Sequence, residues 1–169
     1  MSEREPGTAG AAMGSDAAVQ DLYPQDVAYC YGCGRDNAEG YHIRTFWRDG
    51  VGVARFTPGP NQLSLPGFVY GGLIASLVDC HAVGTAAAEA AERAGVDMGR
   101  GPMPRYVTGS LKVDFKKPTP IGYELELRAR VREAHERKSV VDVTVTAAGV
   151  VTAIGQVVAV RMPESMSRG

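Results

Sequence analysis

From Phe56 to Ala88 the sequence carries a single formally charged side chain, the carboxylate of Asp79. From Leu73 onward the apolar residues of this segment recur at intervals of three and four, which predicts a helix. The predicted helix is apolar on nearly all sides until Glu89, so other elements must enclose it over most of its length. An antiparallel sheet that curls around a single helix can do this.

The rest of the chain supplies segments with the period-two alternation of half-buried antiparallel strands. Two stretches before the helix, 42–48 and 51–57, are joined by Asp49-Gly50, a dipeptide typical of a tight hairpin turn. After the helix, alternation returns over 111–116, 123–132, 139–147 and 150–162. We therefore predict an α+β fold, in which a curved antiparallel sheet of about six strands wraps around one long central helix.

Composition limits the class of protein. The chain has 169 residues, 44% of them hydrophobic and 22% charged, which suits one domain with a real core. The net charge of -1 offers no broad basic field for nucleic acid and no polybasic patch for a membrane surface. We predict a disordered tail over residues 1–28, a single domain over 29–163 and a C-terminal tail over 164–169.

Location follows from what the sequence lacks. Residues 1–28 contain charges among glycine, alanine and serine, without the apolar core of a signal peptide. No run of about 18 uncharged apolar residues is free of glycine and polar interruption, so no membrane span is expected. An odd count of three cysteines fits a reducing compartment. Together these features predict a cytoplasmic protein.

Asp79 is the first candidate for chemistry. It falls in the middle of the predicted helix, where aspartate has poor helix propensity and cannot act as an N-cap. A buried carboxylate is costly unless it is paired, hydrogen-bonded or used, and desolvation raises its pKa. A buried ion pair, or a carboxylate bonded to backbone across a subunit contact, would explain Asp79 structurally. A functional role is the favoured interpretation.

Gly71 and Gly72 stand where the helix begins, and Gly95 follows its end as a stop signal would. A glycine pair at a helix start permits a ligand to approach free backbone N–H groups, with the positive end of the helix dipole behind them. Such a site binds a phosphate or stabilises an oxyanion. A helix start that merely packs tightly explains the pair alone equally well, and the conjunction with Asp79 favours a site.

The segment Gly-Phe-Val-Tyr-Gly-Gly-Leu-Ile-Ala-Ser-Leu-Val-Asp over 67–79 resembles the signature of hotdog-fold acyl-CoA thioesterases of the PaaI-like family, including human thioesterase superfamily members. The Cys-x-Gly-Cys-Gly...Asn-x-x-Gly segment from Cys30 and the Ser-Leu-Lys-Val-Asp-Phe-Lys-Lys-Pro-Thr-Pro strand from Ser110 also resemble family members. The resemblance covers roughly residues 29–162. It implies the hotdog fold and hydrolysis of an acyl-CoA thioester.

The resemblance also implies roles for individual residues. Asp79 matches the carboxylate that acts as general base or nucleophile, and Gly71 matches the glycine whose backbone N–H polarises the thioester carbonyl, with Gly72 as a second candidate donor. Tyr70 stands where the family has a histidine, nine positions before the carboxylate, and is the main departure. The polar residue that binds the attacking water in some members corresponds to Ser64, with Asn61 or Gln62 as alternatives.

Basic side chains that would meet the phosphates of coenzyme A are harder to assign, because solvated strand faces and turns explain each of them equally well. The candidates are Lys112, Lys116, Lys117, Arg137 and Lys138.

The spacing of Gly71 and Asp79 predicts a dimer. They are eight residues apart, which is about 12 Å along a helix. A base and an oxyanion donor must both reach one carbonyl at roughly 3 Å. The simplest solution is an isologous homodimer in which Gly71 of one subunit meets Asp79 of the other, with a dimer of dimers as the expected larger assembly.

Cysteine and histidine offer weaker signals. Cys30-x-x-Cys33 has the spacing of half a zinc site and His42 is a possible third ligand, but no second cysteine pair follows, so a structural loop is favoured. No metal is expected, and no cofactor apart from coenzyme A as part of the substrate. His81 is two positions from Asp79 and points to another face of the helix, so we expect it to be packed or hydrogen-bonded.

The leading functional hypothesis is an acyl-CoA thioesterase that uses Asp79 and Gly71. A hotdog protein that binds acyl-CoA without hydrolysing it is the first alternative, because Tyr70 replaces the family's histidine. A hydratase or dehydratase on the same fold ranks last, because those enzymes pair a catalytic histidine with the acid.

Overall fold

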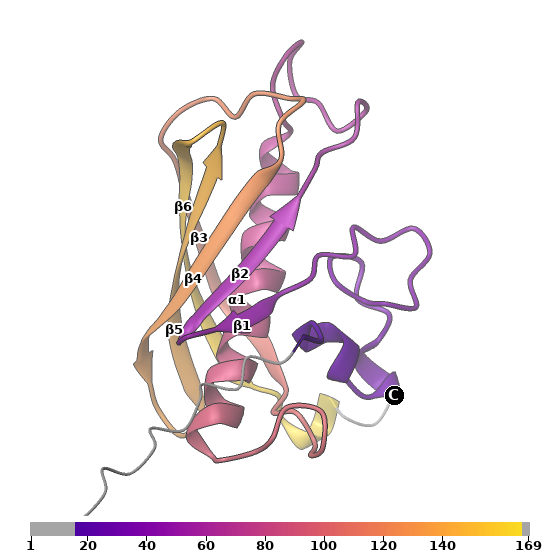
Figure 1. The fold of residues 1–169 in the computed structure, drawn as a ribbon, viewed down its shortest axis with the longest axis vertical. Helices are drawn as coiled ribbons and strands as arrows, with labels where there is room; N and C mark the ends of the chain where they lie inside the picture. Colours follow the sequence, from indigo (N-terminus) through magenta and orange to yellow (C-terminus); the bar gives the residue numbers. More distant parts are fainter. Residues whose placement is uncertain (1–15, 167–169) are drawn as a thin grey trace, which may run out of the picture.

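In the computed structural model, which describes residues 16–166, the strands form one antiparallel sheet (Figure 1). Its six strands are β1 (Phe46–Arg48), β2 (Val51–Phe56), β3 (Tyr106–Phe115), β4 (Leu125–Ala134), β5 (Lys138–Ala147) and β6 (Val150–Arg161). They lie in the order β1-β2-β4-β5-β6-β3, and each neighbouring pair is antiparallel. β1 and β3 are therefore the two edges of the sheet.

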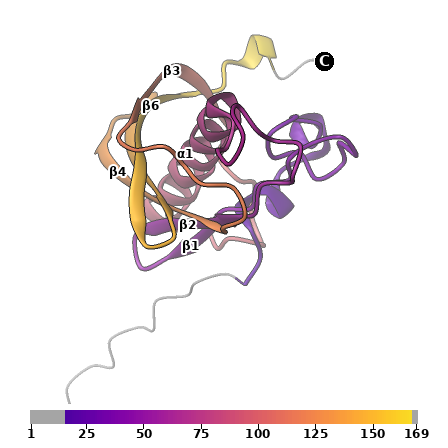
Figure 2. The same ribbon diagram turned by 90° about the horizontal axis from the view of Figure 1, so that it is seen from above.

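The helix α1 (Gly71–Arg93) connects β2 to β3, and the sheet curves around it (Figure 2). α1 begins directly after Tyr70 and ends at the cap Ala94, whose N–H donates to the carbonyl of Ala90 at 3.1 Å. Gly95 follows with φ +66°, a conformation that suits glycine at a helix stop. The predicted sheet around one central helix is confirmed.

The core lies between α1 and the concave face of the sheet. Leu73, Ile74, Leu77 and Val78 are at most 1% exposed, and valines of β5 and β6 pack beneath them. By length and composition alone α1 is apolar enough to cross a membrane, but 61% of its most apolar window is buried inside this fold. The apolar character of α1 is thus accounted for by its place in the core.

One stripe of α1 is left partly uncovered by the sheet. Ala75, Ser76, Asp79 and Val83 are half-buried, whereas most other positions between Leu73 and Ala91 are buried. Residues spaced three and four apart lie on one side of a helix, so these four form a continuous strip. Asp79 lies on this strip.

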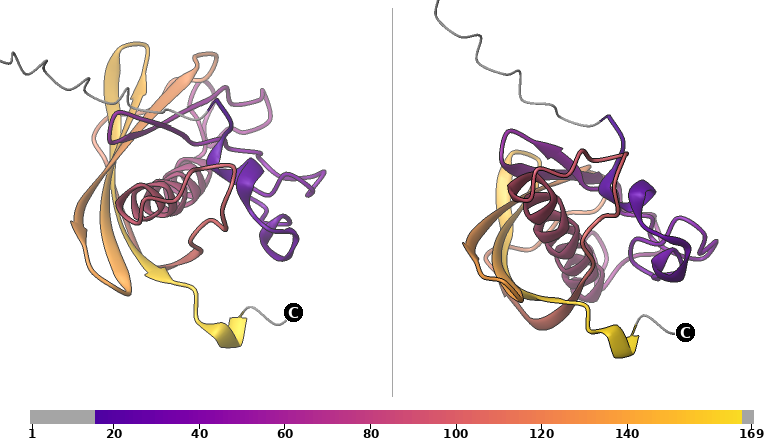
Figure 3. Two further views of the ribbon diagram at one scale, coloured as in Figure 1. Left: turned by 60° about the horizontal axis from the view of Figure 1, so that its bottom comes forward. Right: turned by 90° about the horizontal axis from the view of Figure 1, so that it is seen from below.

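The prediction of a disordered tail over residues 1–28 is wrong for its last part. Residues 16–28 contain two short 3-10 turns, Val19–Leu22 and Gln25–Val27, and lie beside α1 on the side away from β5 and β6 (Figure 3). Ala18, Val19 and Ala28 are at most 1% exposed, because they pack into the core. Residues 1–15 of the predicted tail lie outside the described residues. At the other end, Glu164–Met166 forms a further 3-10 turn and 167–169 lie outside the described residues.

Candidate active site

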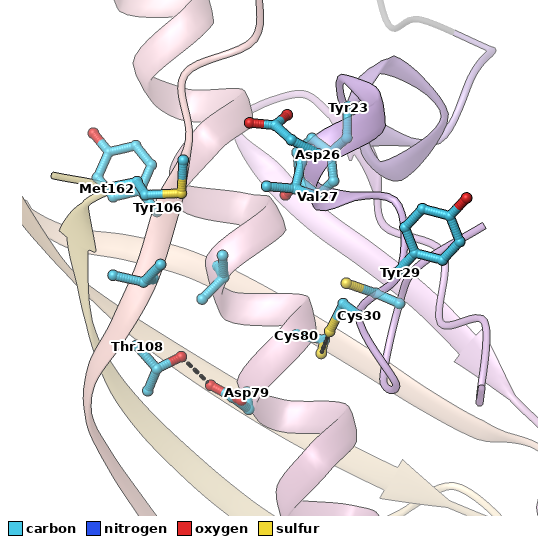
Figure 4. Close-up of a pocket in the computed structure, with 13 residues that line it drawn as sticks. Tyr23, Asp26, Val27, Tyr29, Cys30, Asp79, Cys80, Tyr106, Thr108 and Met162 are labelled. Atoms are coloured by element: carbon cyan, nitrogen blue, oxygen red, sulfur yellow. Dashed lines mark hydrogen bonds between the residues drawn. The ribbon is translucent and has the colours of Figure 1, made fainter. Parts of the chain in front are cut away.

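Asp79 faces a cavity of about 390 Å³ between α1, the first half of β3 and the N-terminal segment (Figure 4). Most of the cavity wall is apolar, and Tyr23 and Tyr106 contribute to it. Thr108 lies across from Asp79 on β3, and the two side chains point toward one another. The Thr108 hydroxyl donates a hydrogen bond to Oδ1 of Asp79. This leaves Oδ2 of the carboxylate without a side-chain donor among residues 16–166.

The environment of Asp79 favours its protonated form. Burial raises the pKa of the carboxyl group, the hydrogen bond from Thr108 lowers it in part, and the nearby Cys30 raises it again. Within residues 16–166, no lysine, arginine or histidine forms an ion pair with Asp79. An ion pair inside the described chain therefore does not explain this carboxylate. A desolvated carboxylate with a raised pKa is suited to accept a proton near neutral pH.

The start of α1 presents two free donors. Tyr70 is the N-cap residue, and its carbonyl accepts from the N–H groups of Leu73 and Ile74 at 3.1 and 3.3 Å. The N–H groups of Gly71 and Gly72 donate no hydrogen bond within residues 16–166. Free donors at a helix start, with the helix dipole behind them, can bind an anion or a developing oxyanion.

Aromatic rings surround these donors. The ring of Tyr70, which is 52% exposed, folds back over the helix start, so a Cβ atom at Gly72 would overlap it. A Cβ atom at Gly71 would lie 3.3 Å from Cζ of Phe115. A larger residue than glycine at position 72 would therefore displace the exposed ring of Tyr70, which replaces the histidine of the PaaI-like family.

Gly71 lines a second cavity of about 470 Å³, together with Ser64, Phe115 and Lys116. Asp79 does not line this cavity, and Gly71 does not line the cavity of Asp79. Their separation of about 12 Å along α1 explains why. A single chain thus holds the candidate base and the candidate oxyanion donor in two different places.

The candidate water-binding residues differ in position. Ser64 lies in the wall of the Gly71 cavity, and its hydroxyl donates to the carbonyl of Val69 at 3.5 Å. Asn61 is exposed in the turn after Gly59. Gln62 accepts from the N–H of Gly59 at 2.7 Å through its side chain, so its Oε1 is already engaged.

The candidate phosphate-binding cations are dispersed. Lys116 and Lys117 line the Gly71 cavity, whereas Lys112 pairs with Asp114 at 3.3 Å on β3. Arg137 lies beside Ala90 and Arg93 in a depression at the C-terminal end of α1, and Lys138 begins β5 next to it. The two ends of α1 are roughly 33 Å apart, so a single chain does not bring Arg137 and Lys138 to Gly71.

His81 is buried and hydrogen-bonded, as predicted. Its Nδ1 lies 2.9 Å from the hydroxyl of Thr45, and its Nε2 lies 3.2 Å from the carbonyl of Gly52, to which it donates. Burial lowers the pKa of His81 to about 4, so the ring is neutral at pH 7. Gln20 extends this network, because its Nε2 donates to Thr45 at 3.1 Å.

The three cysteines meet in the wall of the Asp79 cavity. The Sγ atoms of Cys30, Cys33 and Cys80 all lie within 4.8 Å of one another, and none forms a disulfide. Cys80 comes from α1, directly after Asp79, and the other two come from the loop before β1. His42, the third ligand suggested by the sequence, is exposed and is not part of this cluster.

Comparison with known proteins identifies the family. A model of the thioesterase superfamily matches residues 66–154, which is over half of the chain and includes the start of α1, Asp79 and β3. The chain belongs to the thioesterase superfamily. A thioesterase superfamily protein from Shewanella loihica is 42% identical, with a TM-score of 0.60, and the match covers 75% of this chain and 96% of that chain.

More distant solved structures support the hotdog fold. The Escherichia coli PaaI protein is 19% identical, with a TM-score of 0.59 over 73% of this chain and 81% of that chain. A Streptococcus mutans protein bound to acetyl-CoA is 20% identical, with a TM-score of 0.56 over 69% of this chain and 84% of that chain. No curated protein matches the sequence. The resemblance to PaaI-like hotdog thioesterases is therefore confirmed.

Sequence reasoning missed two neighbours of Asp79 in this superfamily member. Thr108 reaches Asp79 through the packing of α1 against β3, and no local pattern marks this contact. Cys80 joins the Cys30 loop through the close approach of α1 to that loop. A count of the cysteines was the one available signal for the cluster, since the sequence has three and the structure gathers all three.

Proposed function

We propose that this thioesterase-superfamily protein hydrolyses acyl-CoA thioesters to a free acid and coenzyme A. The observation that carries the proposal is Asp79, a half-buried carboxylate with a raised pKa, on the uncovered strip of α1 and facing an apolar cavity. A Streptococcus mutans protein of the same fold binds acetyl-CoA, which supports a coenzyme A thioester as the substrate class.

Asp79 acts in this proposal as general base. Its Oδ2 accepts a proton from a water molecule while the water oxygen attacks the thioester carbonyl, and Thr108 holds Oδ1 in place. The oxyanion of the tetrahedral intermediate accepts hydrogen bonds from the free N–H of Gly71, with Gly72 as a second donor. Collapse of the intermediate breaks the C–S bond, and the coenzyme A thiolate takes up the proton. Direct attack by the Asp79 carboxylate, through a mixed anhydride, is the alternative route.

The site is completed by a second copy of the chain. β3 is a ten-residue edge strand whose outer side pairs with no strand among residues 16–166, and a free edge of this length is a template for pairing with another chain. Leu111 and Phe115 on β3 are 40% and 55% exposed. A two-fold symmetric partner on this edge covers the strip of α1 and places its own Gly71 at Asp79. Association into a dimer of dimers stays a prediction.

Lys116 is the cation that we assign to the phosphates of coenzyme A, because it shares a cavity with Gly71. The roles of Lys112, Arg137 and Lys138 in binding stay predictions.

The test is thiol release from a panel of acyl-CoAs by purified protein. Asp79→Asn keeps the size of the side chain and removes the base, so kcat should fall by about 10² to 10⁴-fold. Glu89→Gln is the matched control, since it makes the same change on α1 outside both cavities and should leave kcat unaltered. Equal rates for wild type and Asp79→Asn would overturn the proposal.

One observation favours a second candidate function, the binding of acyl-CoA without hydrolysis. The Tyr70 ring lies over the helix start, and PaaI-like thioesterases have a histidine at this position. Tight acyl-CoA binding by calorimetry with no thiol release would identify such a carrier or sensor. A hydratase is not favoured, because His81 is engaged by Thr45 and Gly52 and does not line the Asp79 cavity.

A further inference from the structure

The cysteine cluster beside Asp79 has no part in the proposed hydrolysis. Cys33 and Cys80 are buried and Cys30 is exposed, and all three line the Asp79 cavity. We propose that Cys30, Cys33 and Cys80 bind one zinc ion, with a fourth coordination position open to that cavity. The site is argued from the positions of the sulfur atoms, so it does not depend on the reaction proposed for Asp79.

The spacing of the sulfur atoms fits tetrahedral coordination. With Zn–S bonds of about 2.3 Å, two sulfurs at neighbouring corners of the tetrahedron are about 3.8 Å apart. Cys30 Sγ and Cys80 Sγ are 3.8 Å apart, and all three sulfurs lie within 4.8 Å of one another. A single ion at the centre of this triangle is therefore within bonding reach of each thiolate after small side-chain movements.

The loop is built to present Cys30 to a cation. The N–H of Gly34 donates to the Cys30 carbonyl at 2.7 Å, and the N–H of Ile43 donates to the Gly32 carbonyl at 3.0 Å. The loop from Cys30 to Gly34 thus holds a sulfur in place before any ligand binds.

Two glycines make this approach possible. A Cβ atom at Gly34 would overlap the backbone of Cys30, so only glycine permits the tight turn. A Cβ atom at Gly32 would overlap the Cys80 sulfur, so glycine at this position lets α1 bring its thiol into the loop. The glycine pattern of the loop and the position of Cys80 on α1 therefore serve the same convergence.

The donor set selects the ion. Three thiolates are soft ligands, which favour zinc over magnesium and calcium. Within residues 16–166, no histidine, aspartate or glutamate joins the three sulfurs as a fourth ligand. The fourth position therefore takes water or a group of a bound molecule, as in zinc sites with three protein ligands. The ion would tie the loop before β1 to α1, next to Asp79.

Metal content of the full chain tests the site. Wild type produced with zinc and passed through gel filtration should retain roughly one zinc ion per chain, measured by mass spectrometry of the metal. Cys80→Ser should retain less than about a tenth of this amount. Asp79→Asn is the matched control at the neighbouring position, and should keep its zinc while losing thiol release. Loss of activity without loss of metal, or the reverse, separates this site from the proposed reaction.

A measurement on wild type guards against a Cys80→Ser chain that fails to fold. Cobalt(II) in place of zinc should give a thiolate-to-metal charge-transfer band and the intense visible bands of a tetrahedral ion. Octahedral cobalt bands, zinc retained by Cys80→Ser, or wild type with less than about 0.1 zinc per chain would overturn the proposal. A mass two hydrogens lower than expected in zinc-free wild type would identify a disulfide in its place.

Discussion

Replacing Gly71 by proline should remove one proposed oxyanion donor without disturbing α1. Gly71 is the first residue of the helix, a position where proline is favoured because the missing N–H has no partner there. The N–H of Gly71 donates no hydrogen bond within residues 16–166, so no internal bond is lost. Tyr70 has φ -62° and ψ 125°, which is the extended region that a residue before proline adopts.

The size of the effect follows from the geometry of the donors. Loss of one oxyanion donor costs about 10² to 10³-fold in kcat, or about 2.7 to 4 kcal/mol. Because the N–H of Gly72 remains free, we expect the lower end of this range. The new Cβ atom would lie 3.3 Å from Cζ of Phe115, a contact that a small movement of the ring relieves. Gly71→Ala adds the same Cβ atom and keeps the N–H.

The comparison of these two variants isolates the donor. Thiol release from the best acyl-CoA should fall by about 10²-fold in Gly71→Pro relative to Gly71→Ala. Circular dichroism and the unfolding midpoint of both variants show whether α1 is intact. If Gly71→Pro and Gly71→Ala have the same kcat/KM, the N–H of Gly71 is not the oxyanion donor and the reasoning fails.

A mixed dimer then locates the donor relative to the base. Co-expression of Gly71→Pro with Asp79→Asn chains gives heterodimers in about half of the molecules, and each has one site with both groups intact if the site spans two chains. Such a mixture should show about a quarter of wild-type activity. Activity that stays at the level of the single variants would place both groups of each site in one chain.

Three further predictions concern pH. Thr108→Val removes the donor that lowers the pKa of Asp79, so the rise of kcat/KM with pH should move to higher pH, and a shift to lower pH would contradict this. Burial raises the pKa of Asp79 above its unfolded value, so the free energy of unfolding falls as pH rises from the unfolded pKa to the folded pKa. Asp79→Asn should therefore have a higher urea midpoint than wild type at about pH 8. Equal midpoints at that pH would count against it. Burial lowers the pKa of His81 to about 4 in the folded state, so its protonation in the unfolded chain should cost about 2 kcal/mol of stability between about pH 7.5 and about pH 5. Urea unfolding of Asp79→Asn measures this loss without the contribution of Asp79. A urea midpoint that does not change with pH would contradict it.

The regular elements were predictable because their signals are local. The helix carries one charge before Glu89 and is framed by glycines, and α1 begins at Gly71 and ends at Arg93, as these features indicate. The first strand was placed too early, because the expected stretch began at His42, whereas β1 begins at Phe46. His42 has φ 53°, which interrupts an extended chain, and the N–H of Ile43 donates to Gly32 in the cysteine loop.

The N-terminal boundary was not predictable, because the contacts that order it are distant in sequence. Gln20 accepts from the N–H of Thr45 at 2.8 Å, and the Thr45 hydroxyl meets His81 on α1. Each of these polar residues is buried, yet in the sequence Gln20 stands in a stretch of polar and small residues that resembles a tail. Only the folded chain shows that His81 has partners that require burial of this segment.

The candidate site was predictable in its centre and not in its surroundings, for a physical reason. A lone charge in an apolar helix marks Asp79, because burial of a carboxylate is costly wherever it occurs. Thr108 and the three cysteines come from β3, the loop before β1 and α1, so only the packing of these elements brings them to Asp79. Among residues 16–166 the same packing leaves β3 unpaired on its outer side and the strip of α1 uncovered, and both border the Asp79 cavity. In the proposed dimer one surface both pairs a strand and receives an oxyanion donor from the partner, so we expect variants that separate the subunits to lose hydrolysis as well.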